Sequence, residues 1–179
     1  MCWPNLREDF RRVYEHTSYR GRVRKTLHVL LSEPGFHAVC GYRLTRWLVQ
    51  HHILFVGAII QRVLEVWSGV ILPPDAKIGP GLLIYHFGGI VINSHAVIGN
   101  ACTLHHGVTI GNRTPGGGSP TLGDRVMVGA GAKVLGSITI GHDVEIGANA
   151  VVLQSLPDGA VAVGIPARIV RIKGAGGRA

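Results

Sequence analysis

"VMVGAGAKVLGSITIGHDVEIGANAVV", residues 126–152, repeats one pattern every six residues. An aliphatic residue is followed four positions later by a small or aliphatic residue, and the pattern then starts again. The aliphatic positions are Val128, Val134, Ile140, Ile146 and Val152. A period of six fits neither a helix nor a hairpin. It is typical of a solenoid whose short strands turn a corner every six residues, with about 18 residues in each three-cornered coil.

The same period continues upstream to Ile78 with two interruptions. The step from Ile84 to Ile92 is eight residues, and the step from Ile110 to Leu122 is twelve. The longer step contains "NRTPGGGSPT" and has no aliphatic residue at its midpoint. A Gly/Pro-rich insert of this kind predicts a loop that leaves the coil, and loops on rigid scaffolds commonly carry function.

Residues 1–69 follow a different pattern, with apolar residues spaced three and four apart as in helices. The segments are "VRKTLHVLL", "FHAVCGYRLTRWLVQ" and "HILFVGAIIQRVLEVW", with Pro34-Gly35 between the first two. We therefore expect a mainly β protein. An α-helical region spans residues 1–69, a parallel β-helix spans residues 70–170, and a tail spans residues 171–179.

The chain carries a formal net charge of +8, and residues 1–70 hold ten Lys and Arg against five Asp and Glu. These cations fit either a solvated helix face or a surface that meets an anionic membrane or a lipid-linked substrate. Nucleic-acid binding is not expected, because no stacking aromatics are interleaved with the basic residues.

Bulk features indicate a cytoplasmic protein, either free or at the inner face of the membrane. Cys2, Cys40 and Cys102 show no paired spacing, which indicates free thiols and no metal site. The N-terminus lacks the apolar stretch of a signal peptide. The uncharged run at residues 48–60, in the helical part of the sequence, is too short and too polar to span a bilayer.

Two of the chain's histidines are predicted to meet. His86 and His106 each stand two residues after an inward aliphatic residue, and they are separated by one coil plus the two extra residues. They should therefore point outward from one face, on coils about 4.8 Å apart. An imidazole is suited to take the proton of an attacking alcohol near pH 7. His95 and His105 fall at other phases and are expected in structural or interface positions.

Several segments resemble the hexapeptide-repeat acyltransferases, whose fold is a left-handed parallel β-helix. The stretch from "GAGAKVLG" to "GIPARIV" is similar to the acetyl-CoA-binding end of serine O-acetyltransferases, and "PGFHAVCGYRLTRWL" resembles their helical region. "HFGGIVINSHAVIGN" and "HHGVTIGN" are most similar to polysaccharide-type relatives such as the colanic acid acetyltransferases. The resemblance implies an acetyl-CoA-dependent O-acetyltransferase with His86 as general base and His106 in support.

The resemblance also implies where acetyl-CoA binds: a groove between subunits of a homotrimer, or of a dimer of trimers. Backbone amides near Gly111 and Asn112 are candidate donors to the oxyanion, and Lys133 or Arg168 could meet the CoA phosphates. The small residues expected along the groove are Gly111, Ala130 and Ala148.

Departures from the serine enzymes decide the expected acceptor. Ile71 stands where their orienting aspartate would be, which leaves Asp75, a backbone carbonyl or a water to orient His86. Tyr85 replaces the acid before the catalytic histidine, and Gly118 and Ser119 replace the Arg and His of "DRHPKI". Without that cationic clamp for an α-carboxylate, we expect a sugar hydroxyl in a polysaccharide or lipid-linked glycan.

The acceptor-binding residues are then expected to be Tyr85, Asn93 and Ser119. Two alternatives stay open at this point: a serine O-acetyltransferase of cysteine biosynthesis, and an inactive trimeric scaffold.

Overall fold

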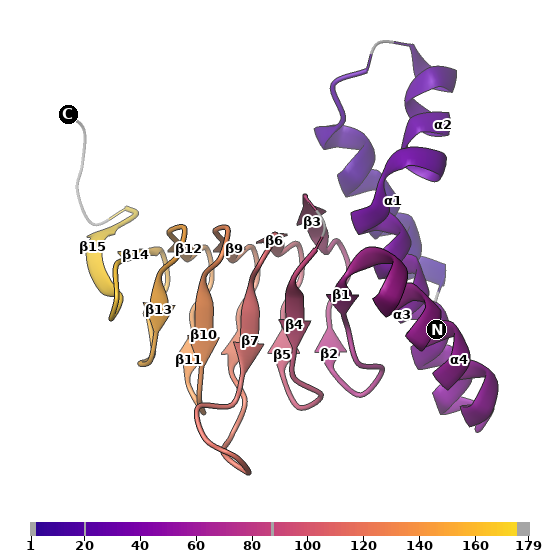
Figure 1. Ribbon diagram of the computed structural model, residues 1–179. Helices are drawn as coiled ribbons and strands as arrows, with labels where there is room; N and C mark the ends of the chain where they lie inside the picture. The colour runs from indigo at the N-terminus through magenta and orange to yellow at the C-terminus, as the bar shows by residue number, and fades with distance from the viewer. Residues whose placement is uncertain (1–2, 20, 87, 175–179) are drawn as a thin grey trace.

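The computed structural model describes residues 3–19, 21–86 and 88–174. Four helices come first and gather at one end of the molecule, and the strands follow as a single stack (Figure 1). The helices are α1 (Trp3–His16), α2 (Arg22–Ser32), α3 (Pro34–Gln50) and α4 (Leu54–Ser68). Gly69 ends α4 in the left-handed conformation, with φ of 64°, a geometry that favours glycine. No helix in the described ranges has the length and apolar character needed to cross a bilayer.

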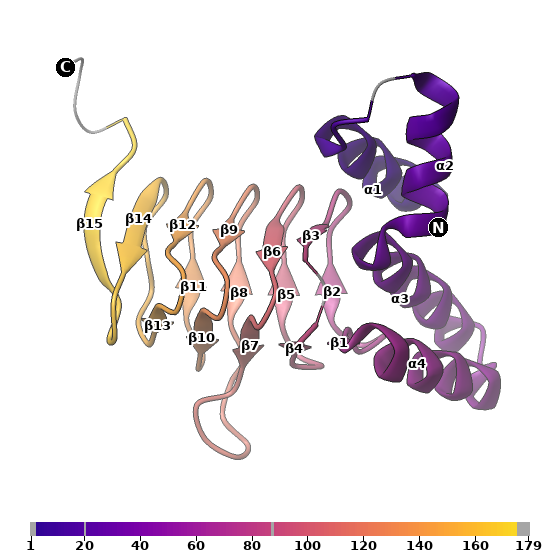
Figure 2. The ribbon, with the colours of Figure 1, turned by 45° about the horizontal axis from the view of Figure 1, so that its top comes forward.

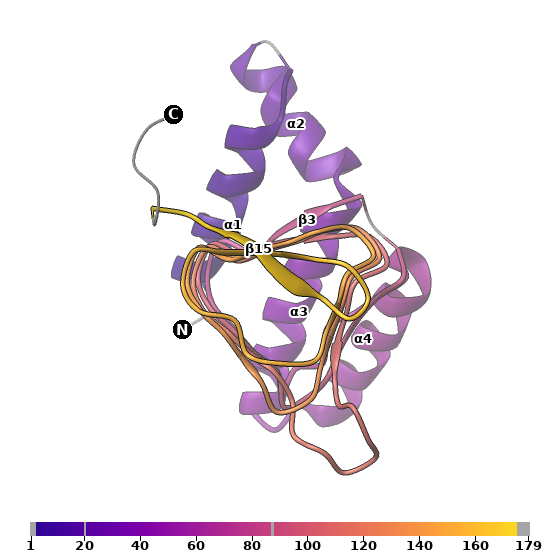
Figure 3. The same ribbon diagram turned by 90° about the vertical axis from the view of Figure 1, so that its left-hand side faces the viewer.

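The strands wind into a parallel β-helix with three faces, as the six-residue period predicts. Face A holds β1, β4, β7, β10 and β13, face B holds β2, β5, β8 and β11, and face C holds β3, β6, β9, β12, β14 and β15. Seen along the axis, the coils superpose as a three-cornered outline (Figure 3). The strand bounds are β1 Val70–Ile71, β2 Lys77–Ile78, β3 Leu83–Tyr85, β4 Ile90–Ile92, β5 Val97–Ile98, β6 Thr103–His105, β7 Thr109–Gly111, β8 Thr121–Leu122, β9 Met127–Val128, β10 Lys133–Leu135, β11 Thr139–Ile140, β12 Glu145–Ile146, β13 Val151–Val152, β14 Ala160–Val163 and β15 Arg168–Ile172.

The core consists of the aliphatic residues that set the period. Ile92 pairs with Ile110, Ile98 with Leu122, and Leu104 with Val128. All the predicted inward aliphatics from Ile78 to Val152 are at most 7% exposed. Backbone amides bond to the neighbouring coil, as in Met127 N–H to the Val144 carbonyl at 2.9 Å. Each coil therefore hides its apolar residues and satisfies the backbone of the coil beside it.

A buried ion pair attaches the helices to the first coil. The Arg43 guanidinium on α3 donates to Asp9 on α1 at 2.9 and 3.2 Å and to the carbonyls of Ile78 and Gly79. Asp9 Oδ1 also accepts from the amides of Gly81 and Leu82. The pair thus forms hydrogen bonds with backbone carbonyls and amides at the end of the solenoid, where no further coil is present to pair with them.

The far end is closed by β14 and β15, which pair antiparallel (Figure 2). Because β15 continues to Ile172, the expected tail at residues 171–179 begins inside a strand. Residues 175–179 lie outside the described part of the chain. The loop at residues 112–120 leaves the coil between β7 and β8, as the break in the period predicts (Figure 1).

Candidate functional site

The two predicted histidines lie side by side at the edge between faces C and A. Tyr85 ends β3 and pairs with His105 at the end of β6, so the next residue on each coil is a histidine. The rings of His86 and His106 are exposed, with centroids 6.0 Å apart and planes at 73°. His86 has φ of 55°, a left-handed conformation that Arg125, Asp143 and Asn149 also adopt in the β-helix.

Side chains at equivalent positions of four successive coils line this edge and change along it from large to small. The residue two positions after the buried aliphatic is a histidine on the first two coils and an alanine on the next two: His86, His106, Ala130 and Ala148. Backbone bonds keep the row in register, since Gly131 N–H donates to the His106 carbonyl and Asn149 N–H to the Ala130 carbonyl. The imidazoles therefore stand beside a strip of methyl groups that leaves the backbone approachable.

Tyr85 and His105 lie next to the exposed histidines, at the ends of β3 and β6 on face C. Their rings stack at 5.3 Å and 14°. Burial lowers the pKa of His105, and the neighbouring His86 and His106 lower it further. The lowered pKa favours the neutral form of the His105 ring.

A cavity of about 390 Å³ opens next to His86, between β3 and the α1–α2 hairpin. Its polar lining includes His16, Tyr19, His28, Glu33 and Tyr85. His28 Nε2 lies 3.0 Å from Glu33 Oε1, and the Tyr19 ring lies 4.2 Å from that of His28. Neither lysine nor arginine lines the cavity within the described residues. Sequence reasoning missed this cavity, because helix residues reach His86 only through tertiary packing.

No acid orients His86 within the part of the chain that the structure describes: neither Asp75 nor any other carboxylate forms an ion pair with it. Its ring contacts are with Tyr85 and His106. Cys102 is fully buried, and burial raises the pKa of its thiol to about 11. A thiolate nucleophile is therefore unavailable there at neutral pH. Among the described residues, no group of three His, Cys, Asp or Glu is placed to hold a metal ion.

Several predicted residues lie at the other edge of face A, away from the histidines. Ser119 Oγ lies 2.7 Å from Oδ1 of both Asn93 and Asn112, at the base of the 112–120 loop. A hydroxyl has one proton, so one of these amides must present its NH₂ group instead. Gly111 ends β7 at the same edge. Within one chain these residues do not meet His86, because face A separates the two edges; their expected place in a groove between subunits stays a prediction.

Lys133 and Arg168 also lie apart from each other. The Lys133 ammonium donates to the Gly107 carbonyl at 2.5 Å, next to His106 and on the histidine edge. Arg168 begins β15 at the far end of face C, where Nη1 donates to the Ala167 carbonyl at 3.1 Å. Lys133 is thus placed near the row of histidines and alanines, and Arg168 near its far end.

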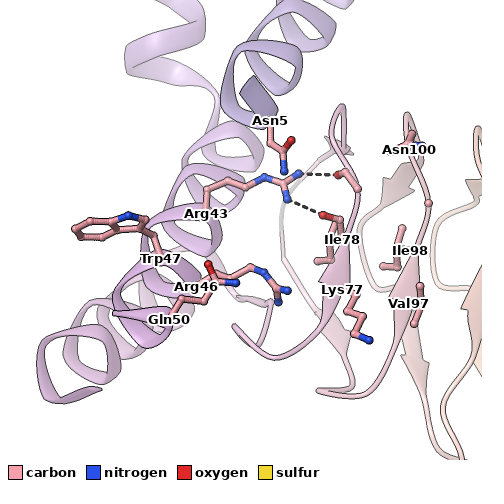
Figure 4. Close-up of a pocket in the computed structure, with 12 residues that line it drawn as sticks. Asn5, Arg43, Arg46, Trp47, Gln50, Lys77, Ile78, Val97, Ile98 and Asn100 are labelled. Carbon is pink, nitrogen blue, oxygen red and sulfur yellow. Dashed lines mark hydrogen bonds between the residues drawn. The ribbon is translucent and has the colours of Figure 1, made fainter. Parts of the chain in front are cut away.

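A second hollow, of about 420 Å³, lies between α1, α3 and face B and holds none of the predicted residues (Figure 4). Arg43, Arg46 and Lys77 supply its cations. Arg43 is engaged by Asp9, and Arg46 Nη1 donates to the carbonyls of Pro74 and Ala76 at 2.6 and 2.7 Å. The two arginines therefore join helices to the first coil.

Comparison with known proteins points to one family. The pattern described as "Bacterial transferase hexapeptide (six repeats)" matches residues 119–154. The structure of serine acetyltransferase from Neisseria gonorrhoeae in complex with serine is 34% identical with a TM-score of 0.84, over 93% of this chain and 68% of that one. That of Brucella abortus serine acetyltransferase with coenzyme A is 31% identical with a TM-score of 0.83, over 96% and 68%.

Among curated proteins, the serine acetyltransferase of Synechococcus elongatus is 39% identical over 109 residues, which are 61% of this chain and 43% of that protein. The chain spans about half the length of the curated relatives it matches. These relatives are named serine acetyltransferases, so the expected likeness to polysaccharide-type enzymes is not supported.

Proposed function

The chain belongs to the hexapeptide-repeat transferases, and we propose that it is an acetyl-CoA-dependent O-acetyltransferase with His86 as general base. One observation carries the proposal: the exposed His86 ring lies at the wall of a 390 Å³ cavity and begins the row of small residues along the same edge. An acceptor in the cavity and a thioester beside the alanines would meet at His86.

The chemistry needs one group that moves a proton. His86 would accept the hydroxyl proton as the acceptor oxygen bonds to the thioester carbonyl carbon. When the carbon–sulfur bond breaks, the imidazolium returns that proton to the departing thiolate. His106, 6.0 Å away, would assist by orienting the reacting groups. Cys102 has no role in this scheme.

Acetyl-CoA would lie along Ala130 and Ala148, whose short side chains let its extended arm approach the backbone. Lys133 is near enough to that strip to meet an anionic group, and Arg168 stands near its end. Gly111 and Asn112 occupy the opposite edge of face A, so their amides reach the oxyanion only if a second copy brings that edge to His86. In the proposed homotrimer each site would lie between neighbours, so a second copy could supply this edge.

L-serine is the first acceptor to test, because the relatives carry that name and one was solved with serine. A sugar hydroxyl is the second candidate, favoured by the cavity lining. Glu33 is the one carboxylate there, and neither lysine nor arginine accompanies it among the described residues. An α-carboxylate would lack a cationic partner in such a cavity, whereas hydroxyls can bond to the Glu33–His28 pair.

The experiment follows CoA release from acetyl-CoA with a thiol reagent, in parallel with L-serine and a panel of sugars and glycolipids. Turnover with serine selects the first acceptor, and turnover with a glycan alone selects the second. Glu33→Gln, which removes the charge but keeps the shape, should raise KM for whichever acceptor binds in the cavity. If acetyl-CoA does not bind to the wild-type protein, the proposed function is wrong and a scaffold role takes its place.

A further inference from the structure

The outer surface of the helical region is unusually apolar. On α4, Phe55, Val63, Val66 and Trp67 are 79%, 61%, 75% and 57% exposed. A helix on the surface of a soluble protein normally turns polar residues outward and apolar ones toward the core. Here α4 packs on α3, and its outward face exposes these apolar side chains together with Arg62. An outward face of this kind needs a partner.

The apolar surface continues from α4 onto α2 and α3. The α2 residues Val23, Leu27, Leu30 and Leu31 are 46–74% exposed. His37 on α3 joins the two helices, because its Nε2 lies 2.7 Å from the Leu30 carbonyl and its ring lies 5.5 Å from that of Trp67. We call this surface the apolar patch. Its exposed members are Val23, Leu27, Leu30, Leu31, Leu44, Trp47, Leu54, Phe55, Val56, Ile59, Val63, Val66 and Trp67.

Positive charge accompanies the apolar patch. Arg22, Arg24 and Lys25 lie in the first turns of α2, which contains neither Asp nor Glu. The carboxylates of the helical region are already occupied: Glu8 and Glu15 pair with Arg11, Asp9 with Arg43, Glu33 with His28, and Glu65 with Arg62. Arg24 and Lys25 lie over the rings of Tyr19 and Tyr14, at 5.2 and 4.5 Å from the ring centroids. No carboxylate among the described residues neutralises the charges of these three α2 cations, which can therefore still attract an external anion.

We propose that the apolar patch docks the protein on an anionic lipid surface. The partner must be apolar where α4 faces it and negatively charged where α2 faces it, and an anionic bilayer interface has both properties. Trp47 and Trp67 supply aromatic rings of the kind enriched at the headgroup level, and Phe55 adds an apolar ring typical of interfacial helices.

Docking would also fix where the His86 cavity lies. α2 contributes Leu27, Leu30 and Leu31 to the patch and His28 to the cavity lining. One helix thus connects the two surfaces, and the cavity would be held close to the lipid headgroups. This inference goes beyond the proposed acetyl transfer, because lipid binding requires neither acetyl-CoA nor an acceptor.

Vesicle flotation tests the proposal with the full chain and no other ligand. Wild-type protein should float with vesicles of phosphatidylcholine and phosphatidylglycerol, and less with phosphatidylcholine alone or at high salt. The double variant Phe55→Ser/Val66→Ser should bind about tenfold more weakly. Both side chains are more than 70% exposed, so the fold should persist. Arg22→Gln/Arg24→Gln should remove the preference for anionic vesicles.

Val170→Ser is the matched control, since Val170 is 62% exposed on β15 at the opposite end of the molecule. It should bind vesicles as the wild type does. The proposal is overturned if wild-type protein does not float, or if Val170→Ser weakens flotation as much as the double variant. It is also overturned if the double variant lowers the mass of the lipid-free assembly in sedimentation equilibrium, because a second copy then covers the patch.

Discussion

Replacing Asp9 with alanine tests how the helical region is held on the β-helix. Asp9 is fully buried, and its carboxylate accepts from the Arg43 guanidinium and from the amides of Gly81 and Leu82. The substitution removes all of these acceptors together. It also leaves the Arg43 charge buried without its carboxylate partner, while the bonds to the carbonyls of Ile78 and Gly79 remain.

The magnitude follows from that burial. Breaking a buried pair by removing one partner costs about 3–5 kcal/mol of the free energy of unfolding. For a chain of this length each kcal/mol lowers Tm by about 2–4 °C, so Asp9→Ala should lower Tm by about 6–20 °C. Asp9→Asn keeps one oxygen acceptor and should lie between the wild type and Asp9→Ala.

Thermal unfolding followed by circular dichroism, at one protein concentration, measures the change. Glu8→Ala is the control, because Glu8 pairs with Arg11 on the exposed side of the same helix. Its Tm should stay within about 2 °C of the wild type. If Asp9→Ala melts as Glu8→Ala does, the buried pair does not hold the helices on the first coil.

Three further outcomes are expected. Val128→Asp should abolish the cooperative melt seen by circular dichroism, because Val128 is fully buried. Met127→Asp is the control on the same strand: Met127 is 38% exposed, so this variant should melt nearly as the wild type does. Equal melting of the two variants would mean that the assignment of inward-facing residues is wrong. The pKa of His105 is lowered below its ordinary 6.5 in the folded chain, so its contribution to stability is present above pH 6.5 and is lost as the pH falls toward the lowered value. The drop in Tm between neutral and acid pH should therefore be smaller in His105→Gln. The same dependence of Tm on pH in this variant and the wild type would contradict this. His106→Ala should lower kcat/KM by about tenfold, less than His86→Ala does, and the reverse order would exchange their roles.

Periodicity predicted the β-helix because the aliphatic residues whose burial stabilises each coil recur every six residues in the sequence. Each coil buries one aliphatic residue per face, so Val128, Val134 and Ile140 report the same environment six residues apart. The same counting placed His86 next to His106 once the two extra residues before Ile92 were included. These predictions needed only local spacing, and the structure contains both features.

No sequence repeat predicts the contacts between the helical region and the first coil. Asp9 and Arg43 are 34 residues apart, and Glu33 lies far from His86 in the sequence, so no repeat relates them. Gly111 is expected, by family resemblance, to line a groove between subunits together with the residues near His86. In one chain these residues lie at opposite edges of face A. The sequence therefore predicts the coil and its histidines, but not the cavity or the edge that faces a neighbour.

The most direct test of the central claim compares wild-type protein with His86→Ala in acetyl-CoA-dependent thiol release, using the acceptor that gives the highest rate. The account predicts turnover by the wild type and a loss of at least about a hundredfold in kcat for the variant, with binding of acetyl-CoA retained. Near-wild-type turnover by His86→Ala would contradict the assignment of the general base. Failure of the wild type to bind acetyl-CoA would contradict the proposed reaction itself.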